Sequence, residues 1–154
     1  MSFEVFISYS HKDKKQREKL ATHLSNLRNQ KIIADWYDGD IVPGTPWEEQ
    51  IVTHLDSAQI ILLLISADFM ASSFCYSVEL QRALKRHERH EARVIPIILR
   101  PTDWEGAPFA KVQVLPDEAK PVSRWPSSDE AYRNVVKGIR RAINDLQARN
   151  AANP

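Results

Sequence analysis

The sequence contains few cysteines and glycines and no long hydrophobic run. Cys75 is the single cysteine among 154 residues, which excludes an internal disulfide and suits a reducing compartment. The four glycines are scattered between positions 39 and 138, so neither a GxGxxG turn nor a glycine-rich phosphate loop is present. The longest wholly apolar run, 60–65, is much shorter than the roughly 20 residues that cross a bilayer. These absences argue against a disulfide-stabilised domain, the common nucleotide-binding loops and a membrane span.

An excess of charge of one sign is also lacking. Lysine and arginine number 21 and aspartate and glutamate number 20, so the formal charge is +1 and no overall potential favours nucleic acid or an anionic membrane. The start, MSFEVFISYSHKDKK, has no apolar stretch after a basic one, as a secretion signal would have. We therefore expect a cytoplasmic protein. The composition, with 43% hydrophobic residues, fits one globular domain over 1–148 and a flexible tail or linker stub over 149–154.

What the sequence does contain is an alternation of strand and helix patterns. Runs of β-branched and aromatic residues predict three strands and a shorter fourth one: FEVFIS (3–8), QIILLLIS (59–66), RVIPIIL (93–99) and KIIADW (31–36). Apolar residues recur at helical spacing over 20–27 and 131–146. This alternation predicts right-handed βαβ crossovers and a mostly parallel sheet with helices on both faces. Pro96 lacks a ladder donor and predicts a local irregularity in its strand.

Two helix starts are marked by capping residues. TPWE (45–48) and SSDE (127–130) each place a hydroxyl before the helix and a glutamate where it closes a capping box. The segment 100–126 contains five prolines and predicts irregular structure, with a short strand near 121–123.

Ligands of such sheets bind at the carboxyl ends of the strands, where crossovers leave toward opposite faces. That rule makes candidates of SYSHKD (8–13), DWYDGDIVPGTPW (35–47) and SADFMASSFCYSVE (66–79). Ser66 stands where a phosphate-accepting response regulator of the same architecture needs an aspartate. The sequence therefore argues against that class.

Other kinds of site have weak support. His87 and His90 have no cysteine or acidic cluster at ligand spacing, so we predict no metal site. Cys75 has no identifiable histidine partner, which favours a structural thiol over a nucleophile. The basic run 82–93 is diluted by glutamates and is typical of a solvated helix end rather than of a nucleic-acid surface.

Glu79 has two interpretations. It is either a surface carboxylate that pairs with Arg82 at helical spacing, or a functional group placed at the crevice. If the helix begins at 72–73, Glu79 lies about two turns in. Cys75 and Tyr76 then lie one turn earlier on the same face.

Three segments together resemble the Toll/interleukin-1 receptor (TIR) domain in its bacterial, cyanobacterial-type form: FEVFISYSHKD (3–13), DWYDGDIVPGTPW (35–47) and ILLLISADFMASSFCYSVEL (61–80). The resemblance extends over nearly the whole chain. It implies a flavodoxin-like three-layer α/β sandwich with a five-stranded parallel sheet and helices on both faces. The fifth strand would be KPVS (120–123).

The resemblance also implies an activity and a site. TIR domains that cleave NAD+ use a glutamate on the third helix, and Glu79 matches that position, with Cys75 where the family often has tryptophan. The segments 9–13 and 37–46 match loops that border the family's substrate cleft. The implied substrate-binding residues are Tyr9, Ser10, His11, Trp36, Tyr37, Trp47, Ser66 and Cys75.

The expected function is that of an NAD+ glycohydrolase, with NAD+ as substrate and neither a cofactor nor a metal. The products would be nicotinamide and ADP-ribose, or a cyclic form of ADP-ribose. The family resemblance further implies self-association with other TIR domains, with the 37–46 loop as a contact, and a role in bacterial antiviral defence signalling. The alternative is a non-catalytic TIR scaffold that acts by TIR–TIR contacts in signal transduction.

Overall fold

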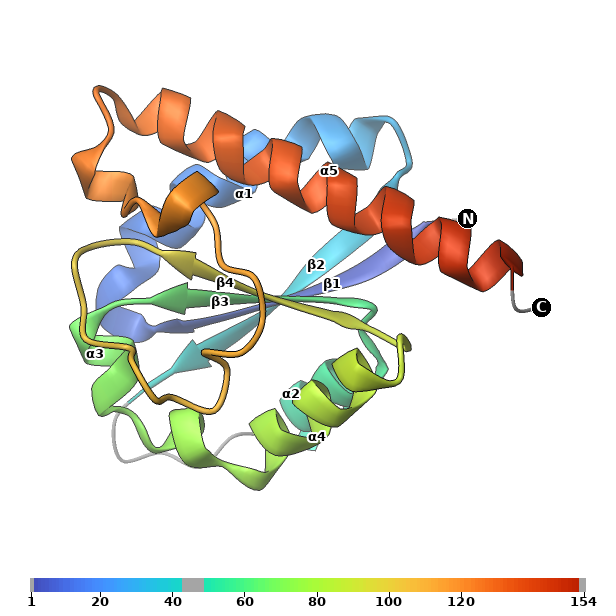
Figure 1. The fold of residues 1–154 in the computed structure, drawn as a ribbon, viewed down its shortest axis with the longest axis horizontal. Helices are drawn as coiled ribbons and strands as arrows, with labels where there is room; N and C mark the ends of the chain where they lie inside the picture. The colour runs from blue at the N-terminus through green and yellow to red at the C-terminus, as the bar shows by residue number, and fades with distance from the viewer. Residues whose placement is uncertain (1, 43–48, 153–154) are drawn as a thin grey trace.

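The computed structural model of the chain describes residues 2–42 and 49–152. Within these residues, four strands form a parallel sheet in the order β2-β1-β3-β4 (Figure 1). The strands are β1 (Phe3–Ser10), β2 (Ile33–Ile41), β3 (Ile60–Ile65) and β4 (Arg93–Ile98). The predicted α/β class and parallel sheet are confirmed. Strand β2 is longer than the predicted 31–36, so the first part of the predicted 37–46 loop is strand, while 43–46 lies outside the described residues.

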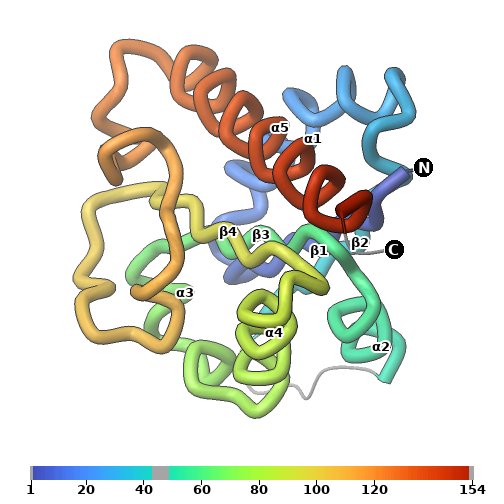
Figure 2. The backbone as a smooth tube through the Cα atoms, turned by 45° about the vertical axis from the view of Figure 1, so that its right-hand side comes forward, coloured from blue at the N-terminus to red at the C-terminus, as the bar shows by residue number. Residues whose placement is uncertain are grey.

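Helices lie on both faces of the sheet (Figures 1 and 2). The described helices are α1 (Lys14–Asn29), α2 (Glu49–Ser57), α3 (Ala67–Ala71), α4 (Val78–Glu88) and α5 (Ser128–Ala152), with short 3₁₀ helices η1 (His11–Asp13), η2 (Ser73–Tyr76), η3 (Asp117–Ala119) and η4 (Val122–Arg124). Helices α1 and α5 cover one face, and α2, α3 and α4 cover the other. The predicted capping segment 45–48, with Trp47, lies outside the described residues.

The core consists of two apolar layers, one on each side of the sheet. Every residue of β3 is buried. Ile60, Leu62 and Leu64 pack beneath α1 and α5, whereas Ile61 and Leu63 pack beneath α2 and α4. Because successive side chains of a strand point to opposite faces, a strand covered on both sides must be apolar throughout. This explains the continuous hydrophobic run in the sequence.

Pro96 is accommodated because β4 is an edge strand of the described sheet. The register between β3 and β4 is continuous through Pro96, so the expected irregularity is absent from this pair. The carbonyl of Pro96 accepts a hydrogen bond from Leu115 N–H at 2.8 Å, on the side away from β3. The nitrogen and the carbonyl of one strand residue point to the same side. The Pro96 nitrogen therefore also faces away from β3, and its lack of a hydrogen costs no bond between β3 and β4.

The expected fifth strand at 120–123 is wrong. Residues Val122–Arg124 form the 3₁₀ helix η4. Leu115 instead pairs with the outer edge of β4 as a single bridge to Ile97. Pro116 and Pro121 follow the bridge, and because neither has an N–H to donate, a regular ladder does not continue there.

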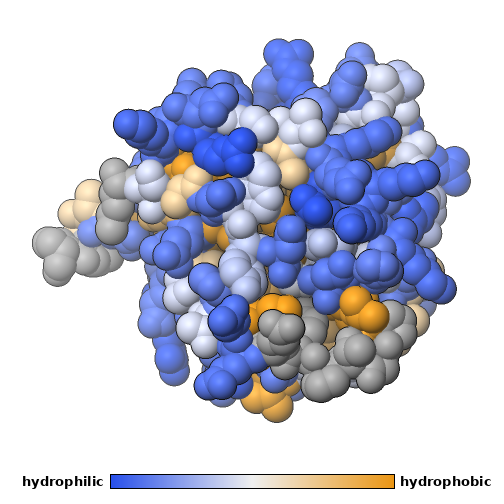
Figure 3. Space-filling view, turned by 180° about the vertical axis from the view of Figure 1, so that it is seen from behind, coloured by the Kyte–Doolittle hydropathy of each residue, from blue (hydrophilic) through white to orange (hydrophobic). Residues whose placement is uncertain are grey.

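The last helix, α5, packs its apolar stripe on the sheet as predicted. The Ser127 hydroxyl accepts a hydrogen bond from Glu130 N–H at 3.2 Å, which confirms the predicted cap. The helix continues to Ala152, into the segment 149–154 that we expected to be a tail. No helix among the described residues is long and apolar enough to cross a membrane. The face of the molecule in Figure 3 is mostly hydrophilic.

Candidate functional site

The carboxyl ends of the strands form the rim where a ligand crevice is expected. The chain leaves β1 toward α1 on one face, and it leaves the neighbouring strand β3 toward α3 on the other face. This reversal between adjacent parallel strands is the usual position of a ligand crevice in an open α/β sheet. The residues that follow β1 and β3 therefore define the candidate site.

A buried polar network joins the two strand ends. The Ser66 hydroxyl donates a hydrogen bond to the carboxylate of Asp13, whose residue is 1% exposed. The same hydroxyl accepts the Phe69 N–H at 3.1 Å and so caps α3. The Arg100 guanidinium lies 2.5 Å from the other carboxylate oxygen of Asp13. Ser66 is buried and fully engaged, so its predicted role in substrate binding is not supported: it holds the rim together.

Ser10 is the last residue of β1, and His11 follows it at the same rim. Ser10 is buried, and its hydroxyl accepts the Lys12 N–H at 3.3 Å to cap η1. His11 is exposed over 53% of its side chain, and its Nδ1 lies 2.9 Å from a carboxylate oxygen of Asp40. Of these two predicted binding residues, His11 is the one that faces solvent.

Glu79 lies in the first turn of α4 rather than two turns into a helix. Residues Ser73–Tyr76 form the separate 3₁₀ helix η2, and the Ser77 hydroxyl caps α4 by accepting the Leu80 N–H at 3.1 Å. A carboxylate in the first turn is stabilised by the positive end of the helix dipole. Glu79 is half-buried there, at the end of α4 that follows the carboxyl edge of the sheet (Figure 1).

The pairing of Glu79 with Arg82, one of the two interpretations of this residue, does not form. The Arg82 guanidinium instead bonds both carboxylate oxygens of Asp56, at 3.2 Å each. Within the described residues, no hydrogen bond or ion pair engages the Glu79 carboxylate. Glu79 is therefore a half-buried acid whose oxygens are available to a ligand.

Cys75 and Tyr76 do not lie one turn before Glu79 in the same helix as predicted, because they belong to the separate 3₁₀ helix η2. Cys75 is fully buried, with Sγ 3.2 Å from the carbonyl oxygen of Phe69 and 3.9 Å from Sδ of Met70. Burial raises the pKa of its thiol to about 11. Cys75 is thus a packing residue, and its burial does not support the predicted contact with substrate. Tyr76 is 64% exposed. It is an exposed aromatic three residues before Glu79 in the chain, and the sequence pattern did not single it out as a binding residue.

Tyr9 is buried on the α1 face rather than open to the crevice. The Arg17 guanidinium lies 5.6 Å from the centre of its ring. Burial, with the nearby carboxylates of Asp38 and Asp40, raises the pKa of Tyr9 to about 12. Its predicted role in substrate binding is therefore not supported by its position.

Trp36 and Tyr37 are also engaged elsewhere. They are the fourth and fifth of the nine residues of β2, roughly 13–17 Å of strand before its carboxyl end. Trp36 lies opposite Val5 of β1 in the sheet, and the Arg28 guanidinium lies 4.7 Å from the centre of its ring. Tyr37 stacks on the His54 ring at 3.7 Å between centres. Their positions do not support the predicted contact with substrate, because the strand continues past both of them.

Comparison with known proteins agrees with the observed fold. The family model described as "TIR domain" matches residues 5–142. The chain belongs to the TIR domain family. A curated relative from Sinorhizobium fredii (strain NBRC 101917 / NGR234), named "Uncharacterized protein y4lF", is 45% identical over 150 residues. That alignment covers 97% of this chain and 46% of the relative, so the chain spans about half of the relative's length.

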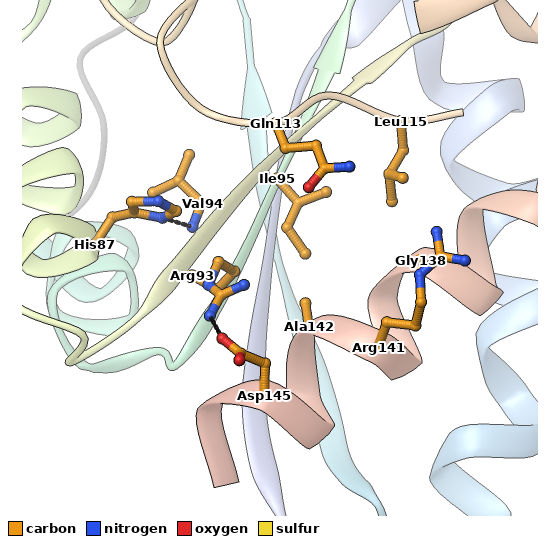
Figure 4. A pocket seen from close by; sticks show the side chains of 10 residues that line it. All are labelled: His87, Arg93, Val94, Ile95, Gln113, Leu115, Gly138, Arg141, Ala142 and Asp145. Atoms are coloured by element: carbon orange, nitrogen blue, oxygen red, sulfur yellow. Dashed lines mark hydrogen bonds and ion pairs between the residues drawn. The ribbon is translucent and has the colours of Figure 1, made fainter. Parts of the chain in front are cut away.

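His87 of this TIR domain has a structural role. His87 Nδ1 accepts a hydrogen bond from the Val94 N–H at 2.9 Å (Figure 4). Burial, with the nearby charge of Arg93, lowers the pKa of His87 and favours its neutral form. His90 follows α4 with a φ of 60°. Among the described residues, no group of histidine, cysteine and acidic side chains is placed to hold a metal ion.

The basic run of the TIR domain is largely engaged by its own protein. Besides the Arg82–Asp56 pair, Arg86 donates a hydrogen bond to the Leu55 carbonyl at 3.3 Å. Arg93 pairs with Asp145 on α5, at the edge of a cavity of about 470 Å³ between α4, β4 and α5 (Figure 4). Two of these cations, Arg82 and Arg93, are thus paired with carboxylates, which lowers the positive charge that the run offers to a nucleic-acid backbone.

Proposed function

We propose that this TIR domain is an NAD+ glycohydrolase in which Glu79 is the catalytic carboxylate. The reaction cleaves the bond between nicotinamide and ribose. Nicotinamide leaves, and the ribosyl carbon is taken by water to give ADP-ribose or by the adenine to give a cyclic product. The observation that carries the proposal is the half-buried Glu79 carboxylate in the first turn of α4, unpaired within the described residues.

One carboxylate is sufficient for this chemistry. Hydrolysis of an ordinary O-glycoside uses two, because the leaving oxygen needs a proton while the oxocarbenium-like sugar needs stabilisation. Nicotinamide in NAD+ is already a cation and leaves as a neutral molecule, so no general acid is required. Glu79 then has one task, which is to stabilise the positive charge that develops on the ribose or to bind its hydroxyl groups.

The surroundings of Glu79 support that task. The Arg82 guanidinium, one turn after Glu79 on α4, is hydrogen-bonded to Asp56. It therefore does not neutralise the Glu79 carboxylate. Tyr76, which is exposed and precedes the acid by three residues, offers an aromatic face for nicotinamide or adenine. In this proposal Tyr76 takes the stacking role for which Tyr9, Trp36 and Tyr37 are badly placed.

Self-association is expected to govern the activity, and TIR domains commonly self-associate. Exposed apolar side chains lie near both the end of β2 and the start of α4: Val42, Tyr76 and Val78 are 40%, 64% and 62% exposed. Apolar groups at a surface favour association. We therefore propose that contacts between copies, including the segment that follows β2, raise turnover, as expected of a protein that signals in bacterial defence.

The test is NAD+ turnover measured across protein concentration, with the products separated by chromatography. Glu79→Gln should lower turnover at least about 100-fold, because it removes the negative charge at nearly constant shape. Glu88→Gln is the matched control, since Glu88 is an exposed acid at the other end of the same helix. That variant should stay within about twofold of wild type.

The second candidate is a TIR scaffold that signals through protein contacts alone, which the exposed apolar side chains also favour. Intact NAD+ at high protein concentration, together with concentration-dependent assembly, would support the scaffold and reject the enzyme. Full activity of Glu79→Gln would instead reject the assignment of Glu79.

A further inference from the structure

A second cavity lies on the opposite face of the sheet from Glu79. It has a volume of about 370 Å³ and lies between the start of α1, the chain after β4 and the start of α5. Its lining includes the cationic side chains of Lys15, Lys19 and Arg100 and contains no carboxylate side chain. The volume lies within the range of small-molecule sites. A net positive lining without an acid favours an anion.

Two of these cations have no counter-charge. Arg100 is neutralised by Asp13 at 2.5 Å. Lys15 and Lys19, by contrast, form no ion pair or hydrogen bond within the described part of the chain. They lie four positions apart on α1, where like charges repel each other along a helix. An anion bound between the two ammonium groups would relieve that repulsion.

A buried hydroxyl at the same cavity also lacks a partner. Tyr132 lines the cavity from α5, and its residue is 1% exposed. Its hydroxyl makes no hydrogen bond within the described residues. A buried polar group without a partner is unfavourable and is rare in native proteins. Burial raises the pKa of this phenol to about 12, so the group stays protonated and can donate to an anion.

The remaining walls suit a ligand with an organic part. Trp125 is half-buried at the cavity, and its indole N–H donates to the Lys120 carbonyl at 3.1 Å, which fixes the ring. Ser127 and Ser128 also line the cavity, at the start of the 25-residue helix α5.

We propose that this cavity is a binding site for a small phosphate ester or diphosphate, held by Lys15, Lys19 and the hydroxyl of Tyr132. Oxygens of a phosphate accept hydrogen bonds from ammonium and hydroxyl groups and carry the charge that the two lysines lack. The site is separate from Glu79 and does not depend on the proposed NAD+ cleavage. It would allow the TIR domain to sense a phosphorylated metabolite on the face opposite to its catalytic acid.

The test is calorimetric titration of the purified Glu79→Gln protein with pyrophosphate, inorganic phosphate, ADP and adenosine. This background prevents turnover at the proposed active site, so failure of one proposal is distinguishable from failure of the other. Pyrophosphate and ADP should bind saturably, and adenosine should bind at least about tenfold more weakly because it lacks the charge.

Variants then locate the site. In the Glu79→Gln protein, the double replacement of Lys15→Gln and Lys19→Gln should weaken pyrophosphate binding at least about tenfold. Lys111→Gln, an exposed lysine outside the cavity lining, should leave it unchanged. Tyr132→Phe should weaken binding about threefold or more, without lowering the melting temperature of the free protein, because it removes an unpaired hydroxyl. The proposal is overturned if pyrophosphate does not bind saturably, if Lys111→Gln weakens binding as much as the lysine pair does, or if neither the pair nor Tyr132→Phe changes it.

Discussion

The hydroxyl of Ser66 donates a hydrogen bond to the buried carboxylate of Asp13, across the carboxyl ends of two neighbouring parallel strands. Arg100, which follows β4, bonds the second oxygen of the same carboxylate. Three strand ends are thereby held in one polar network beneath the rim. The network is structural, and it keeps the first residues of α1 and α3 in place around the candidate crevice.

Replacement of Ser66 by alanine should lower the free energy of unfolding by about 2–4 kcal/mol, because the change removes a helix cap and a hydrogen bond to a buried carboxylate. Urea unfolding followed by circular dichroism measures the loss. Ser57→Ala is the control: its hydroxyl is exposed and bonds Glu4 at 3.3 Å, so its effect should stay within about 0.5 kcal/mol. A loss below about 1 kcal/mol for Ser66→Ala would contradict a structural role for the network.

Arg100→Gln should destabilise the protein by about 3 kcal/mol, because it leaves the Asp13 carboxylate buried without its cation. In an Asp13→Asn background the same replacement should cost at most about 1 kcal/mol, since no buried charge remains. The four proteins form a double-mutant cycle that is measured by urea unfolding. Additive effects of the two replacements would show that the pair does not interact.

Gly138→Ala should destabilise the protein although alanine favours helices. A Cβ at position 138 would lie 2.5 Å from Cδ2 of Leu115, which is buried against α5. Overpacking of this kind costs about 1–3 kcal/mol and exceeds the roughly 1 kcal/mol gained in helix propensity. In a Leu115→Ala background the added methyl group has room, so Gly138→Ala should become stabilising there. Thermal unfolding of the two pairs measures the change, and the same sign in both backgrounds would exclude the clash as the cause.

Cys75 should make the protein sensitive to alkaline pH. Burial raises the pKa of the folded thiol from 9.0 to about 11, so above pH 9 the unfolded chain loses a proton that the folded chain keeps. The thiol's contribution is therefore fully present below about pH 9 and is lost as the pH rises toward 11, by about 1–3 kcal/mol in total. Urea unfolding of wild type and Cys75→Ala from pH 8 to 10 checks this, and equal slopes would contradict it. A disulfide reagent at pH 7.5 should leave the Cys75 thiol of the native protein unmodified. The same thiol should react fully once the protein is unfolded.

The local hydrophobic pattern predicted the position of β3 but not the end of β2. The unbroken apolar run of β3 predicted its position, because a strand buried on both faces admits no polar residue. The end of β2 was not predictable in the same way. Polar residues follow Tyr37, and a strand with one exposed edge tolerates them, so the pattern did not indicate that the strand continues to Ile41. The positions of Trp36 and Tyr37 within β2 therefore do not support their predicted contacts with substrate.

The start of α4 illustrates a second limit. The sequence SSFCYSVE contains several serines, and each is a possible helix cap. The structure uses Ser77, because Phe74 and Cys75 are drawn into the core beside Phe69. That packing separates the buried Cys75 from the exposed Tyr76 and places Glu79 in the first turn.

The sequence by itself determined the α/β alternation, the buried strands, the stripe of α5 and the resemblance to the TIR domain, because each depends on neighbours in the chain or on short motifs in order. Only the tertiary structure decided which side chains meet. Asp13 contacts Ser66 and Arg100 across 53 and 87 positions of sequence. Whether such residues touch depends on the order of the strands and on how each helix packs. No local pattern of hydrophobic and polar residues encodes that order.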